Sequence, residues 1–290
     1  MEIKNVSFIG LGVMGYPMAG YLQKNNFDVT VFNRTISKAK KWSEEYAGKY
    51  SVTPGDASKN SDAIFICVGR DEDLRDVMEG SDGILQNSKS NVIIVDHTTS
   101  SADIAREYAT KCIENNKFFL DAPISGGQAG AENGQLSIMV GGNEKAFNKV
   151  KLILSSYGKA IELIGESGTG QLTKMINQIC IAGLVQGLAE ALTFGKNSNL
   201  DMEKVIKVIS KGAAQSWQME NRYKTMIDGK FDYGFAVDWM RKDLSYCFNE
   251  AKKNKSNLPI TEIVDTFYKQ IQEGGGNRLD TSSLMTLIDK

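Results

Sequence analysis

Short apolar runs alternate with amphipathic stretches through the first half of the chain. Helical spacing follows the first run, over 14–25, and Ser100 with Asp103 three residues later has the pattern that begins a helix. Short apolar strands separated by amphipathic helices predict a parallel sheet covered on both faces, an α/β domain. The runs that predict strands lie at 6–9, 27–32, 63–68, 92–95, 118–120 and 136–142.

The pattern changes near residue 165. From about 170 to 197 the apolar positions keep a helical spacing over a length unusual for one helix. Helical patterns fill the rest, at 201–211, 216–227, 236–254 and 258–272. We therefore expect an α/β domain over 1–165 and an all-α domain over 166–290, built on the long helix.

Composition narrows the class of protein. The 34 basic residues nearly balance the 35 acidic ones, which argues against nucleic acid or an anionic membrane surface as the partner. The four cysteines lie far apart, without metal or redox spacing, as is typical of reduced thiols. No charged leader with an apolar run precedes the first strand, and no uninterrupted apolar stretch approaches the length of a membrane helix. We expect a cytoplasmic protein without a metal.

A glycine-rich loop follows the first predicted strand and precedes the first predicted helix. Its spacing is G-x-G-x-x-G, in which the glycines allow a tight turn, a close approach of the backbone to a pyrophosphate, and close helix–strand packing. The helix N-terminus adds a positive dipole end. An ordinary turn is the alternative, but the position favours a Rossmann dinucleotide-binding domain. The expected cofactor contacts are Gly10, Leu11, Gly12, Val13, Met14 and Gly15.

The end of the second strand bears on the choice of cofactor. Sites for NAD usually place a carboxylate there to bind the ribose hydroxyls. Here the residues are Asn33, Arg34 and Thr35, which offer a guanidinium and a hydroxyl to a 2′-phosphate. The alternative is that Arg34 is an ordinary surface arginine without a role in cofactor binding. The sequence favours NADP, with NAD as the alternative.

If a nicotinamide binds, some group must exchange a proton with the substrate oxygen while the hydride moves. Histidine is nearly excluded, because His97 is the only one in the chain. Lys174 lies one turn into the long helix, and Asn177 and Gln178 share its face at i+3 and i+4. Such a lysine can donate a proton to a carbonyl if its surroundings tune its pKa. A solvated helix lysine is the alternative.

Four ordered segments, "GLGVMG", "DAPISGG", "GTGQLTKMINQ" and "RKDL", resemble those of the β-hydroxyacid dehydrogenases over essentially the whole chain. The resemblance implies that Lys174 is the general acid/base. It implies that Ser125, Gly126 and Gly127 bind the substrate carboxylate, and that Lys242 reaches the cofactor and substrate. Bare glycine amides and a hydroxyl suit an anion. Many members carry Asn four residues after the lysine, where this chain has Gln178, so the substrate-binding amide stays open between Gln178 and Asn177.

Further contacts follow from the same resemblance. Thr98 or Thr99 is expected near the nicotinamide ribose, with His97 either its neighbour or a structural residue. Trp217 and Phe235 resemble aromatic side chains that line the substrate pocket, with core packing as the alternative.

The expected activity is oxidoreduction between a short 3-hydroxy acid and its semialdehyde with NADP(H). 3-Hydroxyisobutyrate is the first candidate, tartronate semialdehyde (2-hydroxy-3-oxopropionate) the alternative, and succinic semialdehyde ranks third. A different class, a nucleotide-binding module without catalysis, is disfavoured because both lysines are present. The apolar long helix predicts a homodimer or homotetramer.

Overall fold

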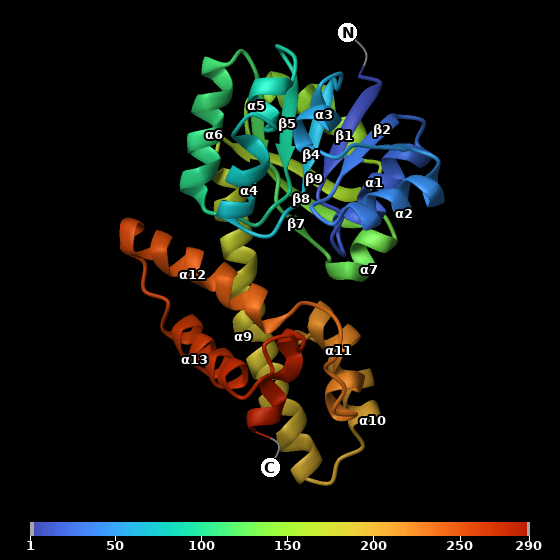
Figure 1. The fold of residues 1–290 in the computed structure, drawn as a ribbon. Helices are drawn as coiled ribbons and strands as arrows, with labels where there is room; N and C mark the ends of the chain where they lie inside the picture. Colours follow the sequence, from blue (N-terminus) through green and yellow to red (C-terminus); the bar gives the residue numbers. More distant parts are fainter. Residues whose placement is uncertain (1–2, 289–290) are drawn as a thin grey trace. The chain divides into compact units, whose positions relative to one another are not determined.

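The computed structural model describes residues 3–288. It divides into two compact units, Met1–Lys174 and Met175–Lys290. The boundary falls inside the long helix, α9 (Thr169–Asn197), whereas the sequence pattern placed the change at about residue 165, before that helix begins. The first unit is the α/β part and the second is helical, as the sequence predicts (Figure 1).

The sheet of the first unit has the strand order β3-β2-β1-β4-β5-β6-β8-β7, and β9 pairs with β8. The ladders that join β1 through β6 are parallel. Each strand that the apolar runs predict is present. The strands are β1 (Asn5–Ile9), β2 (Asp28–Phe32), β3 (Lys49–Tyr50), β4 (Ala63–Ile66), β5 (Ile93–Asp96), β6 (Phe118–Asp121), β7 (Ile124–Ser125), β8 (Leu136–Gly142) and β9 (Gly158–Gly165).

The predicted parallel sheet is confirmed from β1 through β6 but not at β8, which runs antiparallel to β6 and β7. Leu120 lies opposite Gly142, and Ile124 opposite Ile138, so β7 continues the β6 ladder in the same register. The break between them holds Pro123, which has no N–H to give to a ladder. The chain then turns back through α7 (Gly127–Glu132), which makes β8 antiparallel.

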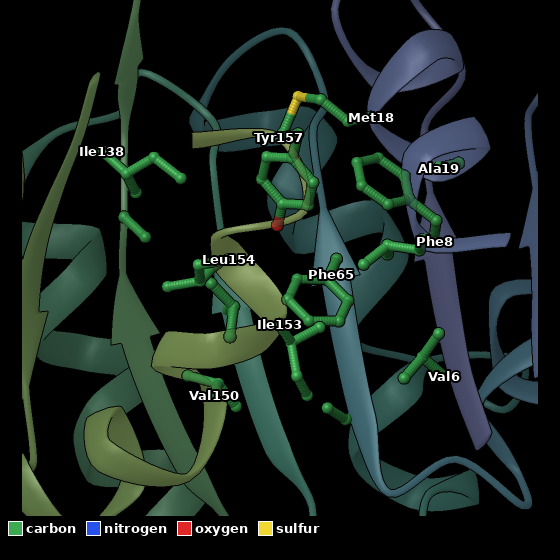
Figure 2. Packing of buried hydrophobic residues seen from close by; sticks show 14 of the residues in the cluster. Val6, Phe8, Met18, Ala19, Phe65, Ile138, Val150, Ile153, Leu154 and Tyr157 are labelled. Carbon is green, nitrogen blue, oxygen red and sulfur yellow. The ribbon is translucent and has the colours of Figure 1, made fainter. Parts of the chain in front are cut away.

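Both faces of the sheet are buried under helices. On β4, Phe65 belongs to one apolar cluster, while Ile64 and Ile66 belong to the other. Figure 2 shows Phe65 packed with Phe8 and Tyr157 in the first cluster, which also contains side chains from α1, α2 and α8. The second cluster contains side chains from α3, α4, α5 and α6. Continuous apolar strands thus bury alternate residues on opposite faces.

Three helices of the first unit, α3, α6 and α8, begin at a side chain that accepts a hydrogen bond from a backbone N–H of the first turn. The sequence pattern assigned the start of one helix to Ser100, but the cap is Ser101, whose hydroxyl accepts from the Ile104 N–H at 3.1 Å. The bounds are α1 (Gly15–Lys24), α2 (Ile36–Tyr46), α3 (Pro54–Ser58), α4 (Asp71–Met78), α5 (Ile84–Asn87), α6 (Ala102–Glu114) and α8 (Glu144–Leu154).

The second unit is built on the greater part of α9. Ala182, Val185, Leu188 and Leu192 are buried on one side of this helix. The other helices match the predicted ranges closely: α10 (Met202–Ile209), α11 (Trp217–Ile227), α12 (Val237–Asn254) and α13 (Pro259–Glu273), followed by a 3₁₀ helix, η1 (Thr281–Leu287). A helical pattern of this kind is locally encoded, which explains the agreement.

Large apolar side chains of α9 are also exposed, including Ile176, Leu184 and Phe194. By length and composition alone, α9 is apolar enough to cross a membrane, but one such helix is weak evidence, because a long packed helix has the same composition. Such a surface is also what association of two copies would bury. The homodimer or homotetramer stays a prediction.

Candidate active site

The glycine loop joins β1 to α1, and its three glycines differ in surroundings. Gly10 has φ of +97°, and a Cβ there would lie 2.3 Å from the Cys67 carbonyl oxygen. A Cβ on Gly15 would lie 2.0 Å from the Gly10 oxygen, so helix and strand pack without space for a side chain. A Cβ added to Gly12 would have no neighbouring atom within 4 Å. The loop therefore fits a nucleotide, because it leaves open space beside Gly12 in front of the α1 N-terminus.

Asn33, Arg34 and Thr35 lie together after β2 but do different things. The Asn33 side-chain oxygen accepts from the Leu11 N–H at 2.9 Å, which ties the end of β2 to the glycine loop. The Arg34 side chain is 86% exposed and forms an ion pair with Asp73 at 3.2 Å. Thr35 is the N-cap residue of α2. Arg34 is thus accessible to an anion from solvent, as a 2′-phosphate contact requires.

The loop after β5 separates Thr98 from Thr99. Thr98 is buried, its hydroxyl accepts from the Val68 N–H at 3.1 Å, and its own N–H donates to Asp96 Oδ1 at 2.9 Å. Thr99 is only partly buried. Burial raises the pKa of Asp96 to about 7, and the neighbouring Asp121 adds to the rise. Of the two threonines, Thr98 mainly holds the loop in place.

His97 is a structural residue. Its ring is buried, with Nδ1 2.7 Å from the Ala122 carbonyl oxygen and Nε2 2.9 Å from the Tyr157 hydroxyl. Because a carbonyl only accepts, Nδ1 carries the proton and donates, and Nε2 accepts from the hydroxyl. Burial lowers the pKa of His97 to about 4, so the ring is neutral and engaged at both nitrogens. It is not available as the general base.

Ser125, Gly126 and Gly127 form the turn from β7 into α7. Gly126 has φ of +136° and Gly127 has φ of +61°, conformations that favour glycine. A Cβ on Gly127 would meet nothing within 4 Å, so its requirement is conformational and its surroundings are open. Ser125 is partly buried and pairs with Ser137 of β8. The turn thus places a serine beside two glycines, of which Gly127 is exposed and Gly126 lies against the Leu136 side chain.

Lys174 is the last residue of the first unit and lies in the second turn of α9. It is 7% exposed, so the alternative of a solvated helix lysine is wrong. Gln171, three residues earlier, binds the loop after β5: its Nε2 donates to the Thr98 carbonyl at 2.7 Å. Its Oε1 accepts from the Ser100 N–H at 3.1 Å. The turn before Lys174 is therefore anchored to the strand ends.

In the second unit, Asn177, Gln178 and Lys242 belong to one polar network. Asn177 Nδ2 donates to Gln178 Oε1 at 2.8 Å, and Gln178 Nε2 donates to Asp243 Oδ2 at 2.6 Å. Lys242 pairs with Asp243 Oδ1 at 3.1 Å. Gln178 is 2% exposed and Asn177 is more exposed, so Gln178 is engaged on the protein side. Which of the two amides binds substrate stays a prediction.

Trp217 and Phe235 are 44% and 36% exposed, so core packing, the alternative weighed for both, is wrong. Trp217 is the first residue of α11, and the Arg222 guanidinium lies 4.9 Å from the centre of its ring. The Phe235 N–H donates to Asp280 at 2.9 Å. Two exposed aromatic rings are available to a ligand, and their contact with substrate stays a prediction.

Comparison with known families covers nearly the entire chain. Residues 5–165 match the NAD binding domain of 6-phosphogluconate dehydrogenase. Residues 168–288 match the family described as NAD-binding of NADP-dependent 3-hydroxyisobutyrate dehydrogenase. The chain belongs to the β-hydroxyacid dehydrogenase family. It is an oxidoreductase that uses a nicotinamide dinucleotide.

Relatives of this dehydrogenase match along its full length. An uncharacterized oxidoreductase of Shewanella frigidimarina is 58% identical over 285 residues, 98% of each chain. The 2-hydroxy-3-oxopropionate reductase of Escherichia coli is 34% identical over 287 residues, 98% of this chain and 97% of the relative. The crystal structure of a 3-hydroxyisobutyrate dehydrogenase from Salmonella typhimurium has a TM-score of 0.87 at 26% identity, covering 98% of this chain and 99% of that one.

Residues that sequence patterns did not reveal support the predicted ones. Asp121, Gln171 and Asp243 are buried polar residues that bind the segments carrying the candidate site residues. Asp121 lies inside "DAPISGG", and Gln171 inside "GTGQLTKMINQ", so the motifs contained them without showing their task. One sequence signal was available for Asp121, because it directly follows a buried apolar run. An acid in such a place needs hydrogen-bond partners, since burying an unpaired charge is costly.

Proposed function

We propose that this dehydrogenase interconverts a short 3-hydroxy acid and its semialdehyde with NADP(H). The observation that carries the proposal is the buried Lys174 on α9, preceded by a turn that is hydrogen-bonded to the loop after β5. A buried lysine at such a point is a candidate acid/base, because burial is what brings a lysine pKa toward the range useful for proton transfer.

The proposed chemistry divides between cofactor and protein. The nicotinamide, when bound, supplies or receives the hydride at the carbon of the substrate aldehyde or alcohol. In reduction, the Lys174 ammonium gives its proton to the aldehyde oxygen as that oxygen gains negative charge. In oxidation, the neutral amine takes the hydroxyl proton. Either way the lysine changes by one proton and the hydride carries both electrons, so charge and atoms balance.

The proposed substrate anchor is the turn Ser125–Gly127. The Ser125 hydroxyl and the backbone of two glycines offer donors to a carboxylate, and the missing side chains let the anion come close. Holding the carboxylate at one end of a three-carbon acid positions the carbonyl at the other end for the lysine. Orientation of this kind supplies a large part of the rate in a reaction between two bound partners.

We propose NADP as the preferred cofactor because of Arg34. Its guanidinium is 86% exposed and follows β2, where the adenosine ribose lies in Rossmann domains. Arg34→Ala is expected to raise the KM for NADPH about tenfold, in line with the loss of one solvent-exposed charged contact, and to leave the KM for NADH unchanged. Equal effects on both cofactors would refute the assignment.

Two substrates are proposed in order. 3-Hydroxyisobutyrate is the first, and the full-length similarity to the Salmonella enzyme supports it. Tartronate semialdehyde is the second, favoured by the 34% identity with the Escherichia coli reductase, named for the same compound, 2-hydroxy-3-oxopropionate. Compared at the same oxidation level, the two substrates differ in the central carbon, which carries a methyl in the first and a hydroxyl in the second. A site built to bind that hydroxyl would reject the methyl compound by about 10⁴-fold, whereas an apolar site discriminates by only about 10²-fold.

The test compares kcat/KM for tartronate, methylmalonate and succinic semialdehydes, each with NADPH and with NADH. Lys174→Ala is the central variant, expected to lower kcat by about 10²- to 10⁴-fold while NADPH still binds, as followed by its fluorescence. Lys196→Ala is the matched control, an exposed lysine near the end of the same helix, and should keep full activity. Undiminished turnover by Lys174→Ala would overturn the proposed role.

A further inference from the structure

The carboxylate of Asp121 holds the N-terminus of α9. Asp121 ends β6 and is fully buried. Its Oδ1 accepts from the Gly168 N–H at 2.7 Å, and its Oδ2 accepts from the Gln171 N–H at 3.0 Å. These N–H groups belong to the start of the helix, where four amides have no partner within the helix itself. One carboxylate thus binds two amides of that turn that are three residues apart, 47 and 50 residues away along the chain.

The backbone around this carboxylate is packed so closely that it excludes side chains. A Cβ on Gly141 of β8 would lie 2.7 Å from Asp121 Oδ1, and a Cβ on Gly170 would lie 2.8 Å from Oδ2. On Gly170 it would also lie 2.4 Å from the Met139 carbonyl oxygen. The first turn of α9 is therefore in direct backbone contact with the ends of β6 and β8. Contact at this distance leaves little freedom for the helix to slide or rotate.

Gln171 makes the second attachment. Its backbone N–H is bound by Asp121, and its side chain reaches the other way, to the Ser100 N–H and the Thr98 carbonyl. The side chain is fully buried. The turn that precedes Lys174 is therefore fixed both to the strand that leads into Ser125 and to the loop of Thr98 and Thr99.

We propose that Asp121 is a positioning residue for Lys174, and that Gln171 sets the place of that turn relative to the Thr98–Thr99 loop. The inference rests on the proposed role of Lys174. An α-helix is stiff, so an anchor three residues before the lysine determines where its amine can reach. Because Ser125 follows Asp121 by four residues, one anchor relates the proposed proton donor to the proposed carboxylate site. A misplacement of about 1 Å costs about 10²-fold in such chemistry.

A purely structural cap predicts different behaviour. If Asp121 only stabilises the helix end, its variants lower the melting temperature but leave kcat and its pH dependence unchanged in the folded protein. If Asp121 positions Lys174, kcat falls and the pH profile of kcat shifts, while NADPH binding is unaffected. These readouts separate the two roles.

The central variant is Asp121→Asn. Asparagine keeps one acceptor but turns an NH₂ group toward the second backbone N–H, so one of the two hydrogen bonds is lost. The expected result is a 10- to 100-fold lower kcat, an NADPH dissociation constant within about twofold of the parent's by fluorescence, and a displaced pH profile. Asp121→Glu keeps both acceptors on a longer stem and is expected to recover part of kcat. A parental kcat and pH profile in folded Asp121→Asn would overturn the proposal.

Asp201→Asn is the matched control. Asp201 caps α10 and accepts from the Lys204 N–H at 3.2 Å, so it is an aspartate at a helix start outside the proposed site. It is expected to lose some thermal stability and to keep kcat. Should Asp121→Asn fail to fold, Gln171→Met keeps the side-chain length and removes both side-chain hydrogen bonds. Gln171→Met is expected to lower kcat and also to weaken NADPH binding. The proposal would be overturned if this variant kept both the kcat and the NADPH affinity of the parent.

A double-variant comparison distinguishes the positioning role of Asp121 from the proposed function of Lys174, on which it rests. If Asp121 acts through Lys174, adding Asp121→Asn to Lys174→Ala causes no further loss of kcat, whereas independent effects would multiply. Full turnover by Lys174→Ala would remove the proposed function itself. Loss of turnover by Lys174→Ala, with no effect of Asp121→Asn, would leave the proposed function standing and remove only the role of Asp121.

Discussion

Two neighbouring residues, Asp96 and His97, should give the protein opposite dependences of stability on pH that cancel. Burial raises the pKa of Asp96 from 3.8 to about 7 and lowers the pKa of His97 from 6.5 to about 4. Between these limits the folded protein has a proton on Asp96 and none on the His97 ring. The unfolded chain has the reverse. Asp96 Oδ2 has no hydrogen-bond partner within residues 3–288, so no donor at this oxygen favours the ionised form.

The magnitudes follow from proton linkage, in which one proton changes the free energy of unfolding by about 1.4 kcal/mol per pH unit. For Asp96, with its raised pKa, stability is lost as pH rises from the unfolded toward the folded pKa. For His97, with its lowered pKa, stability is lost as pH falls below the unfolded pKa. From about pH 6.5 to about pH 4.5, each group alone changes the free energy of unfolding by about 3 kcal/mol, and together they change it little.

The assay is urea unfolding at several pH values across this range. In Asp96→Asn the His97 slope remains, so this variant should lose about 3 kcal/mol relative to the parent as pH falls. In His97→Gln the Asp96 slope remains, so this variant should gain about 3 kcal/mol over the same change. Tyr157→Phe removes only the hydroxyl that donates to the ring and should cost about 1 kcal/mol at every pH. Parallel stability curves for Asp96→Asn, His97→Gln and the parent would refute the two pKa shifts.

The remaining predictions compare neighbouring residues in matched pairs. Gly12→Ala should keep the thermal stability of the parent, because its Cβ meets open space, but should weaken NADPH binding at least tenfold by fluorescence titration. Gly15→Ala should instead unfold at a temperature lower by about 5–10 °C, which corresponds to about 2–3 kcal/mol, because its Cβ would lie 2.0 Å from a carbonyl oxygen. Ser101→Ala should cost about 1 kcal/mol by urea unfolding, since it removes a helix cap, whereas Ser100→Ala should be nearly neutral, because the Ser100 hydroxyl has no hydrogen-bond partner in the described part of the chain.

The sequence predicted the elements of this fold well where local pattern decides them. The buried strands of the parallel part and all four helices after α9 follow from apolar spacing. The direction of β8 did not follow, because an antiparallel strand has the same pattern as a parallel one. It depends on the chain reversal through α7. The strand β9, Gly158–Gly165, was missed because its side chains are mostly exposed or half-buried.

The candidate site was predictable in its motifs but not in its supports. Lys174, Ser125 and the glycine loop carry sequence signals, since each needs a residue type at a set distance from a strand or helix end. The partners of Gln171, by contrast, are more than 70 residues away in sequence. No spacing rule connects residues so far apart, so a glutamine within a helical pattern gives no sign of its contacts.

Asp96 and Asp121 show why local sequence cannot settle the chemistry. Each is an acid directly after a short apolar run, and the two are paired on the neighbouring strands β5 and β6. Two buried carboxylates this close disfavour a charge on both. Burial raises the pKa of both carboxyls, but the N–H donors from the start of α9 oppose the rise at Asp121, whereas Asp96 accepts from Thr98 alone. The difference between their donors therefore follows from where α9 begins, and that position is also what brings Lys174 to the end of the sheet.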